Sequence, residues 1–341
     1  MTSSVEKIWL DETRRRRRLF KGMMLTGLLI LILLVIFWAM LTQPLLSSVQ
    51  LDESLPEISA SRLEAHVRML SETFVPRDER HTENLDSVAA YIQQEFNKAG
   101  GTVSEQPFEV KGKTYKNVIA LFGPETKERI VVGAHYDAAG EYPAADDNAS
   151  GVAGLIELAY LLQSATLPMR VELVAYILEE PPYFRSKQMG SAIHANSLRQ
   201  QETAVRLMIS VEMIGYFSDA PNSQQLPTPL LSPFYPSQGN FIAIVGKFGQ
   251  GGLTRKAKRA MRGASVLPVY SINAPSFIPG IDFSDHLNYW NAGYDAIMIT
   301  DTSFYRNRNY HTPQDKPETL DYRKMAMTVQ GIYATVLAVA Q

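Results

Sequence analysis

The stretch between residues 130 and 162 constrains the fold of this chain more than any other. Ile130-Val131-Val132 predicts a buried strand, and residues 152–162 predict an apolar helix that begins after a polar turn over residues 148–151. Between these two elements, His135 and Asp147 lie near strand-to-loop edges. Imidazole nitrogen and carboxylate oxygen are ligands that zinc accepts. The sequence therefore predicts a metal site on a strand–loop–helix unit.

Strand-like and helix-like segments alternate through the remainder of the chain. The predicted strands cover residues 118–122, 129–133, 171–178, 207–213, 241–245 and 296–300. The predicted helices cover residues 61–70, 84–98, 152–162, 191–199, 253–262 and 322–340. This alternation is typical of a single α/β domain with three layers, in which helices flank a mixed, mostly parallel central sheet.

One long insertion interrupts this alternation. Residues 219–239 are rich in Pro, Ser and Gln and are predicted to form a loop. Loops of this length often shape a binding site, although a disordered surface segment is an equally open interpretation.

The first forty residues differ from the rest of the chain. Arg14 to Arg18 are five consecutive arginines, and residues 23–41 are apolar except for Thr26. As a helix, these apolar residues would span about 28 Å, close to the hydrocarbon thickness of a lipid bilayer. Because basic residues precede the span, we expect a cytoplasmic basic tail over 1–22, a transmembrane anchor over 23–41, and export of all that follows. In a bacterium this places the domain in the periplasm or on the extracellular face.

A cleaved signal peptide is the main alternative to this anchor. Its apolar region is usually only about 7–15 residues long, and no clear Ala-x-Ala-like cleavage site follows the apolar segment here. A buried core helix is a third possibility, but such a helix is rarely apolar all round beside five arginines. We therefore predict an uncleaved single-pass anchor, a linker over 42–60 and a folded domain over 61–341.

Composition limits the chemistry of any metal site. The chain has 341 residues, no cysteine and a net charge of −2. Thiolate sites and disulfides are excluded, so His, Asp and Glu must hold any metal. The near-neutral charge gives no indication of a nucleic-acid partner.

Possible metal ligands follow several predicted strands. In an open α/β sheet, ligands bind beyond the carboxyl ends of the strands. The residues at these positions are His135 and Asp137, Glu179 and Glu180, Glu212, and Asp301 with His311 ten residues further on. An adjacent Glu-Glu pair at the end of an apolar strand is unfavourable unless a cation neutralises it. A single acid in such a place is more often a cap or a surface charge, so the prediction depends on the whole set.

The order of these residues resembles the co-catalytic di-zinc aminopeptidase family, the clan MH metallopeptidases. Its relatives include bacterial leucyl aminopeptidases, glutamate carboxypeptidases and glutaminyl cyclases. The matching segments are residues 134–137, 145–151, Glu179-Glu180, 212–215, Ser284-Asp285-His286 and Tyr310-His311-Thr312. They extend over residues 130 to 315, and together they are highly specific.

The resemblance implies a site with two Zn²⁺ per chain. Asp147 would bridge both ions, with a cis peptide bond to Asn148. His135 and Glu212 would complete one site. A second pair, Glu180 and His311, would complete the other. The resemblance also implies that Asp137 orients His135 from behind.

The resemblance assigns the catalytic roles to two further residues. Glu179 would be the general base acting on a bridging zinc-bound water, and Tyr310 would donate a hydrogen bond to the oxyanion. Glu212 stands where the family more commonly has aspartate, and its extra methylene would shift this ligand. Asp285 and His286 match a family element near the site without a defined role.

The chain is therefore expected to be a membrane-anchored, exported, zinc-dependent aminopeptidase. Residues 61–341 would form the zinc peptidase domain, with peptides as substrates and the lipid bilayer as a partner of the anchor. Two alternatives remain open: a glutaminyl cyclase-like zinc acyltransferase with one zinc, and a non-catalytic scaffold with a peptidase fold. The preferred N-terminal residue and the oligomeric state have no signature in the sequence.

Overall fold

The computed structural model describes residues 4–341, and within this range eight strands form one mixed sheet. Their order is β1-β2-β4-β3-β5-β8-β6-β7. The strands are β1 (Thr102–Val110), β2 (Lys113–Phe122), β3 (Glu128–His135), β4 (Arg170–Tyr176), β5 (Ala204–Glu212), β6 (Ile242–Gly246), β7 (Val269–Asn273) and β8 (Ala296–Thr300). The central strands β4, β3, β5 and β8 are parallel, and antiparallel pairs occur toward both edges. This arrangement confirms the predicted fold class.

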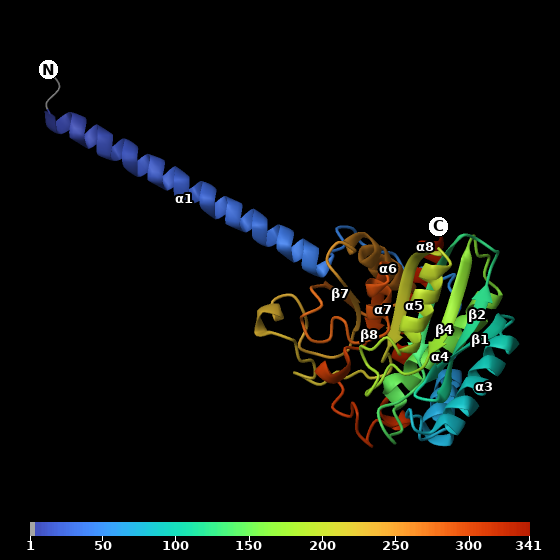
Figure 1. The fold of residues 1–341 in the computed structure, drawn as a ribbon. Helices are drawn as coiled ribbons and strands as arrows, with labels where there is room; N and C mark the ends of the chain where they lie inside the picture. The colour runs from blue at the N-terminus through green and yellow to red at the C-terminus, as the bar shows by residue number, and fades with distance from the viewer. Residues whose placement is uncertain (1–3) are drawn as a thin grey trace.

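Helices cover both faces of the sheet (Figure 1). They are α1 (Ser4–Thr42), α2 (Ala60–Arg68), α3 (Thr82–Lys98), α4 (Gly151–Gln163), α5 (Gly190–Gln200), α6 (Gly251–Ala264), α7 (His286–Asn291) and α8 (Tyr322–Ala340). Alternate residues of β3 face opposite sides, as a strand requires. Ile130 and Val132 join the large core under α2, α3, α4, α6 and α8, whereas Val131 joins the smaller core under α5 and α7. The domain therefore has three layers.

The sequence did not predict β1, β7 or α7. Strand β1 is an exposed edge strand that contains Pro107, so it lacks an apolar run. Strand β7 has five residues and α7 has six, which is too short for a clear hydrophobic period. The predicted loop over 219–239 does connect β5 to β6, and it includes a short 3-10 turn, η3 (Pro229–Leu231).

Helix α1 extends far from the domain (Figure 1). It contains both the basic run and the apolar segment, and it is long and apolar enough to cross a membrane. The first residues of the predicted basic tail, 1–3, lie outside the described residues. At the other end, Leu41, Thr42 and Gln43 are buried against the domain.

Candidate metal centre

The predicted ligands converge at one edge of the sheet, where the parallel strands end. They are His135 at the end of β3, Asp147 ahead of α4, Glu179 and Glu180 after β4, Glu212 at the end of β5, and His311 in the segment after β8. All of them except the half-buried His311 are buried. Because the strands are parallel, residues far apart in the sequence reach the same edge.

The ligand atoms form two groups that share Asp147. In one group, His135 Nε2 lies 3.4 Å from Asp147 Oδ1 and 3.4 Å from Glu212 Oε2. In the other, His311 Nε2 lies 3.0 Å from Asp147 Oδ2 and 3.3 Å from Glu180 Oε2. Asp147 thus offers one oxygen to each group.

The geometry of the two groups fits a pair of zinc ions. Within residues 4–341, the Nε2 atoms of His135 and His311 and the Oε1 atom of Glu180 are buried without a hydrogen-bond partner. Such atoms are rare in native interiors and need an explanation. Tetrahedral ligands at about 2.0–2.1 Å from zinc lie about 3.3 Å from one another, which matches the spacing between the donor atoms.

The charges at the centre also call for cations. Burial raises the pKa of Glu180 to about 8, and the charge of Asp147 adds to this effect. Burial likewise raises the pKa values of Glu179 and Glu212. For Asp147, burial alone would raise the pKa, but the close imidazoles of His135 and His311 outweigh it and hold the pKa below its usual range. Carboxylates this close together in a buried site are stable only beside compensating positive charge.

Asp137 supports the centre from behind. Its carboxylate accepts the backbone N–H of Glu179 at 3.2 Å and of Glu180 at 3.1 Å. His135 Nδ1 lies 3.2 Å from the Asp137 backbone oxygen and 3.6 Å from its carboxylate. His135 Nδ1 can therefore donate an orienting hydrogen bond to the Asp137 carbonyl, while the Asp137 carboxylate fixes the turn at Glu179 and Glu180.

Glu212 is held by the segment Ser284-Asp285-His286, which matches a family element that has no defined role. Ser284 Oγ donates to Glu212 Oε2 at 2.6 Å and contacts Ser210 Oγ at 2.8 Å. The neighbouring Asp285 is fully buried, and His286 Nε2 donates to a backbone carbonyl at 2.8 Å. The serine gives the longer side chain of Glu212 a fixed partner.

The loop before α4 depends on Asp315, which the sequence analysis missed. Its carboxylate accepts the backbone N–H of Asp146 at 3.0 Å and of Asp147 at 3.1 Å. The peptide bond between Asp147 and Asn148 is cis, as the resemblance implied. Asn148 Nδ2 donates to the Val211 carbonyl at 2.9 Å, which ties this loop to β5.

Arg77 is a second residue that sequence reasoning missed. It is fully buried and donates to the carbonyls of Tyr136 at 3.1 Å and Ala144 at 2.9 Å, on either side of the loop between β3 and α4. Burial lowers its pKa to about 10, against the opposing charges of Asp315 and Asp147. Arg77 binds backbone carbonyls, which every residue has, so no pattern of side chains in the sequence could reveal its role.

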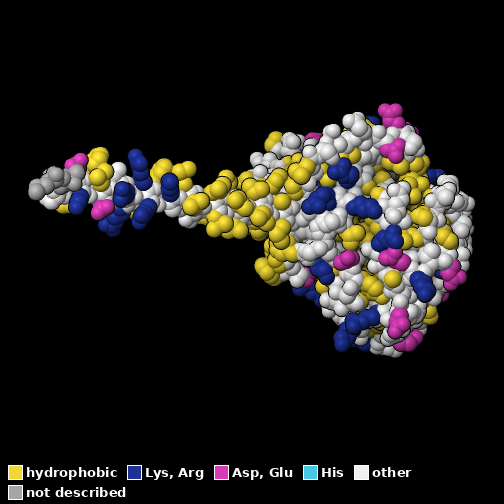
Figure 2. All heavy atoms as spheres, turned by 90° about the horizontal axis from the view of Figure 1, so that it is seen from above, with side chains coloured by type: hydrophobic (Ala, Val, Ile, Leu, Met, Phe, Trp, Pro, Cys, Tyr) yellow, Lys and Arg dark blue, Asp and Glu magenta, His cyan; other side chains and the backbone are white. Residues whose placement is uncertain are grey.

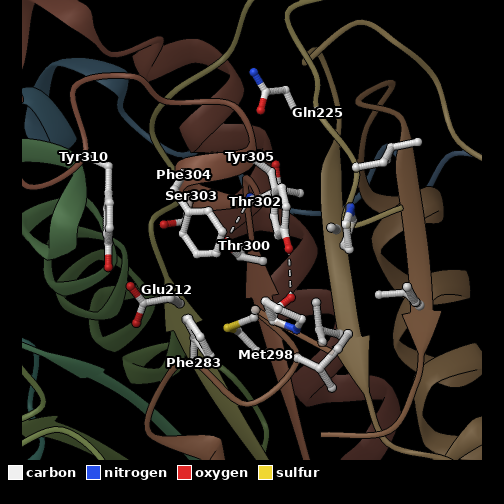
Figure 3. Close-up of a pocket in the computed structure, with 18 of the residues that line it drawn as sticks. Glu212, Gln225, Phe283, Met298, Thr300, Thr302, Ser303, Phe304, Tyr305 and Tyr310 are labelled. Atoms are coloured by element: carbon white, nitrogen blue, oxygen red, sulfur yellow. Dashed lines mark hydrogen bonds between the residues drawn. The ribbon is translucent and has the colours of Figure 1, made fainter. Parts of the chain in front are cut away.

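A cavity of about 250 Å³ opens beside the centre. Glu212 and Tyr310 lie at one end, and Phe283, Phe304 and Tyr305 face the interior (Figure 3). The Tyr310 ring stacks on the neighbouring imidazole of His311, with 3.8 Å between ring centroids. Burial raises the pKa of Tyr310, so its phenol remains a hydrogen-bond donor.

The rest of the cavity wall is mostly apolar. The loop over residues 219–239 contributes Gln224, Gln225, Leu226, Pro227, Leu231 and Tyr235. This loop therefore shapes the pocket, in line with one of the two interpretations of the sequence. Among residues 4–341, no lysine or arginine lines the cavity, whereas four carboxylates do.

Comparisons with known proteins agree with this geometry. Residues 117–336 match peptidase family M28. The chain is 50% identical over 282 residues to the Escherichia coli (strain K12) protein YfbL, and the match covers 80% of this chain and 86% of YfbL.

Solved structures that share the fold include an aminopeptidase and a glutaminyl cyclase. BSAP, a zinc aminopeptidase from Bacillus subtilis, superposes with a TM-score of 0.67 at 15% identity, over 83% of this chain and 95% of that one. The Bacteroides thetaiotaomicron glutaminyl cyclase superposes with a TM-score of 0.61 at 18% identity, over 83% of this chain and 99% of that one. At these identities the similarity shows the fold alone.

Proposed function

Because this chain belongs to peptidase family M28, we propose that it is a membrane-anchored, exported zinc aminopeptidase that removes N-terminal residues from peptides. One observation carries the proposal. Two ligand groups share Asp147, and Glu179 lies next to them with its Oε2 atom 3.9 Å from His135 Nε2. A site that only bound a structural metal would need neither the second group nor the additional acid.

We assign the ligands as the family resemblance implies. His135, Asp147 and Glu212 would hold one zinc ion. Asp147 would be shared with Glu180 and His311, which would hold the other. When bound, zinc polarises a carbonyl group and lowers the pKa of water to about 7.

Glu179 and Tyr310 would perform the acid–base and oxyanion roles. Burial raises the pKa of Glu179, which suits a carboxylate that takes a proton from the attacking water and returns it to the leaving amine. Tyr310 lines the same end of the cavity, and its protonated phenol can donate to the tetrahedral oxyanion.

The charge of the cavity favours an aminopeptidase over a carboxypeptidase. Asp147, Glu180 and Glu212 are assigned to zinc, so Glu179 is the lining acid that remains to attract a peptide's N-terminal ammonium. A C-terminal carboxylate would need a cationic partner, and the lining drawn from residues 4–341 includes no lysine or arginine. The remainder of the cavity is mostly apolar, which suits an apolar side chain on the first residue.

The test is hydrolysis of aminoacyl chromogenic substrates by the full chain in detergent. Glu179→Gln should retain two zinc ions but lower kcat by about 10²–10⁴-fold, the usual contribution of a general base. Glu125→Gln, on the exposed loop before β3, is the matched control and should retain full activity. Activity that survives Glu179→Gln would refute the assigned mechanism.

Two further assays separate this function from its alternatives. An N-acetylated substrate should not be hydrolysed, because its ammonium group is gone. Cyclisation of peptides with an N-terminal glutamine, with one zinc per chain, would instead support a glutaminyl cyclase. Full metal content without either reaction would support a non-catalytic scaffold.

Export and anchoring need their own test, and the absence of cysteine makes it simple. Ser87→Cys in α3 should react with a membrane-impermeant maleimide added to intact cells, whereas Lys7→Cys near the N-terminus should not. The mass of the protein recovered from membranes should include the whole of α1. A mature chain that begins after residue 41 would show that α1 is a cleaved signal peptide.

A further inference from the structure

We propose that the face of the domain around the end of α1 is a membrane-binding surface that lies on the outward leaflet and binds anionic phospholipid headgroups. The inference rests on the proposed uncleaved anchor, but it does not depend on the proposed catalysis. We define this surface by the exposed basic residues of α6 and by two exposed leucines, Leu46 and Leu230.

The length of α1 leaves no gap between the bilayer and the domain. At about 1.5 Å per residue, residues 23–40 span about 27 Å, and a bilayer has a hydrocarbon core of about 30 Å. Met40 is 48% exposed, whereas the next residue, Leu41, is 4% exposed because it packs against the domain. The whole apolar segment, as far as the surface of the domain, must therefore lie in the hydrocarbon core. This brings the lipid headgroups against that surface.

The junction between α1 and the domain is held by hydrogen bonds rather than by a flexible linker. The Thr42 carbonyl accepts from Lys258 Nζ at 2.9 Å and from Ser271 Oγ at 2.7 Å. Arg255 donates to Gln43 Oε1 at 2.9 Å. The two bonds to Thr42 satisfy a carbonyl group at the end of the helix, where such groups otherwise lack partners. They also fix which face of the domain meets the membrane.

The side chains of this face are basic, and they complement the charge of an anionic membrane. Helix α6 has no acidic residue, and its exposed side chains include Arg255, Lys256, Arg259 and Arg262. Arg259 donates to Ser47 Oγ at 3.1 Å, so α6 lies beside the chain that leaves α1. Figure 2 shows Lys and Arg side chains gathered on the domain next to the point where the apolar helix joins it. Basic clusters beside a membrane span bind anionic headgroups.

Exposed leucines flank the same junction. Leu46 is 94% exposed and lies four residues after the end of α1. Leu230 is 79% exposed, and its neighbour Leu231 is buried in a cluster with Leu41. Large apolar side chains this exposed mark an interaction surface. Apolar side chains combined with basic ones are typical of protein surfaces that contact the membrane interface. Continuity with the membrane span favours lipid over a second protein copy.

The test uses single cysteines that carry an environment-sensitive fluorophore on the full chain in lipid nanodiscs. Labels go at Leu46→Cys and Leu230→Cys on the surface, at Val35→Cys within the span, and at Ser87→Cys. The last is the control, because α3 lies on the side of the domain opposite α1 (Figure 1). Nitroxide-labelled phosphatidylglycerol should quench the labels at 35, 46 and 230 but not the label at 87.

Charge reversal tests the headgroup contact. With Lys256→Glu and Arg262→Glu together, quenching at 230 by nitroxide-labelled phosphatidylglycerol should fall, because the anionic lipid is no longer enriched at this surface, while quenching at 35 persists. The matched control reverses two exposed lysines elsewhere, Lys127→Glu and Lys187→Glu, and should leave quenching at 230 unchanged. Nanodiscs of phosphatidylcholine that carry nitroxide-labelled phosphatidylcholine as the quencher should give the same reduced quenching at 230 with the unaltered chain.

The outcomes separate this proposal from its premises. Quenching at 35 without quenching at 46 and 230 overturns the membrane-binding surface and keeps the anchor. Absence of quenching at 35 overturns both. Labels at 46 and 230 that are shielded from water but not quenched by lipid assign the surface to another protein copy and overturn the proposal. None of these readouts changes if the chain proves inactive as a peptidase.

Discussion

Glu172 is a buried acid whose contribution to stability can be worked out from its contacts. It lies on β4, where its carboxylate is 3.0 Å from His194 Nε2 and 2.8 Å from Arg129 Nη1. Burial alone would raise the pKa of Glu172, but the charge and hydrogen bond of His194, together with Arg129, outweigh it and lower the pKa to about 2. The substitution Glu172→Gln removes the charge and preserves the shape.

The expected effect depends on pH in a defined direction. The pKa of an ordinary glutamate is 4.5. Since each pKa unit corresponds to about 1.4 kcal/mol, a native pKa of about 2 makes the ionised Glu172 contribute about 3 kcal/mol to the free energy of unfolding. A lowered pKa stabilises the fold fully above the unfolded value, and this stabilisation is lost as the pH falls from 4.5 toward 2. Glu172→Gln should therefore be most damaging near neutral pH.

The assay is urea-induced unfolding of the full chain in detergent at about pH 6 and about pH 3. At about pH 6, Glu172→Gln should lower the free energy of unfolding by about 3 kcal/mol, because Arg129 and His194 lose their buried partner. Close to pH 3 the difference from wild type should shrink to less than half. Glu125→Gln, on the exposed loop before β3, is the control and should stay within about 0.5 kcal/mol at both pH values. An equal loss at the two pH values would refute the reasoning.

Three other substitutions test separate parts of the structure. Asp315→Asn should weaken zinc affinity by about 10–100-fold in a chelator competition titration, because it disturbs the backbone donors behind the bridging ligand; unchanged affinity would deny this supporting role. Gly133→Ala should abolish the stable fold, measured by circular dichroism and thermal unfolding, because a Cβ there would lie 2.8 Å from Tyr176 Cζ in a closely packed core. Leu41→Ala should lower the free energy of unfolding by about 2–4 kcal/mol in detergent, whereas Met40→Ala, which is half exposed, should have little effect. Equal effects at 40 and 41 would show that α1 does not pack into the domain.

Much of the fold could be predicted because the strands at the centre of the sheet are buried on both faces. Such strands read as continuous apolar runs, as residues 130–132 and 207–209 do. Edge elements lack this signal. Strand β1 is mostly exposed, so its pairing with β2 rather than its composition makes it a strand. Helix α1 begins well before the predicted membrane span over 23–41, since the arginines before residue 23 are good helix formers but carry no hydrophobic period.

The grouping of the candidate ligands could be predicted because most of them are tied to strand ends, but the residues that support them could not. His135 and Glu212 directly end apolar strands, which marks them in the sequence. Asp315 and Arg77 act on backbone N–H and C=O groups, which every residue has, so their partners leave no pattern. The contact of Ser284 with Glu212 likewise depends on two segments that meet only in the folded domain.

The packing of α1 connects membrane attachment to the pocket. Leu41 shares one apolar cluster with Leu231, Val245, Ile281 and Met298, and these four residues also line the cavity beside the metal centre. Removal of α1 at residue 41 would leave a void behind this wall, and the loss of one buried leucine typically destabilises a fold by about 2–5 kcal/mol. A signal peptide is removed without such consequences, because the mature domain does not pack against it. The burial of Leu41 is thus a structural argument for an anchor that stays attached, and it predicts that a soluble fragment beginning after residue 43 would bind substrates more weakly than the full chain.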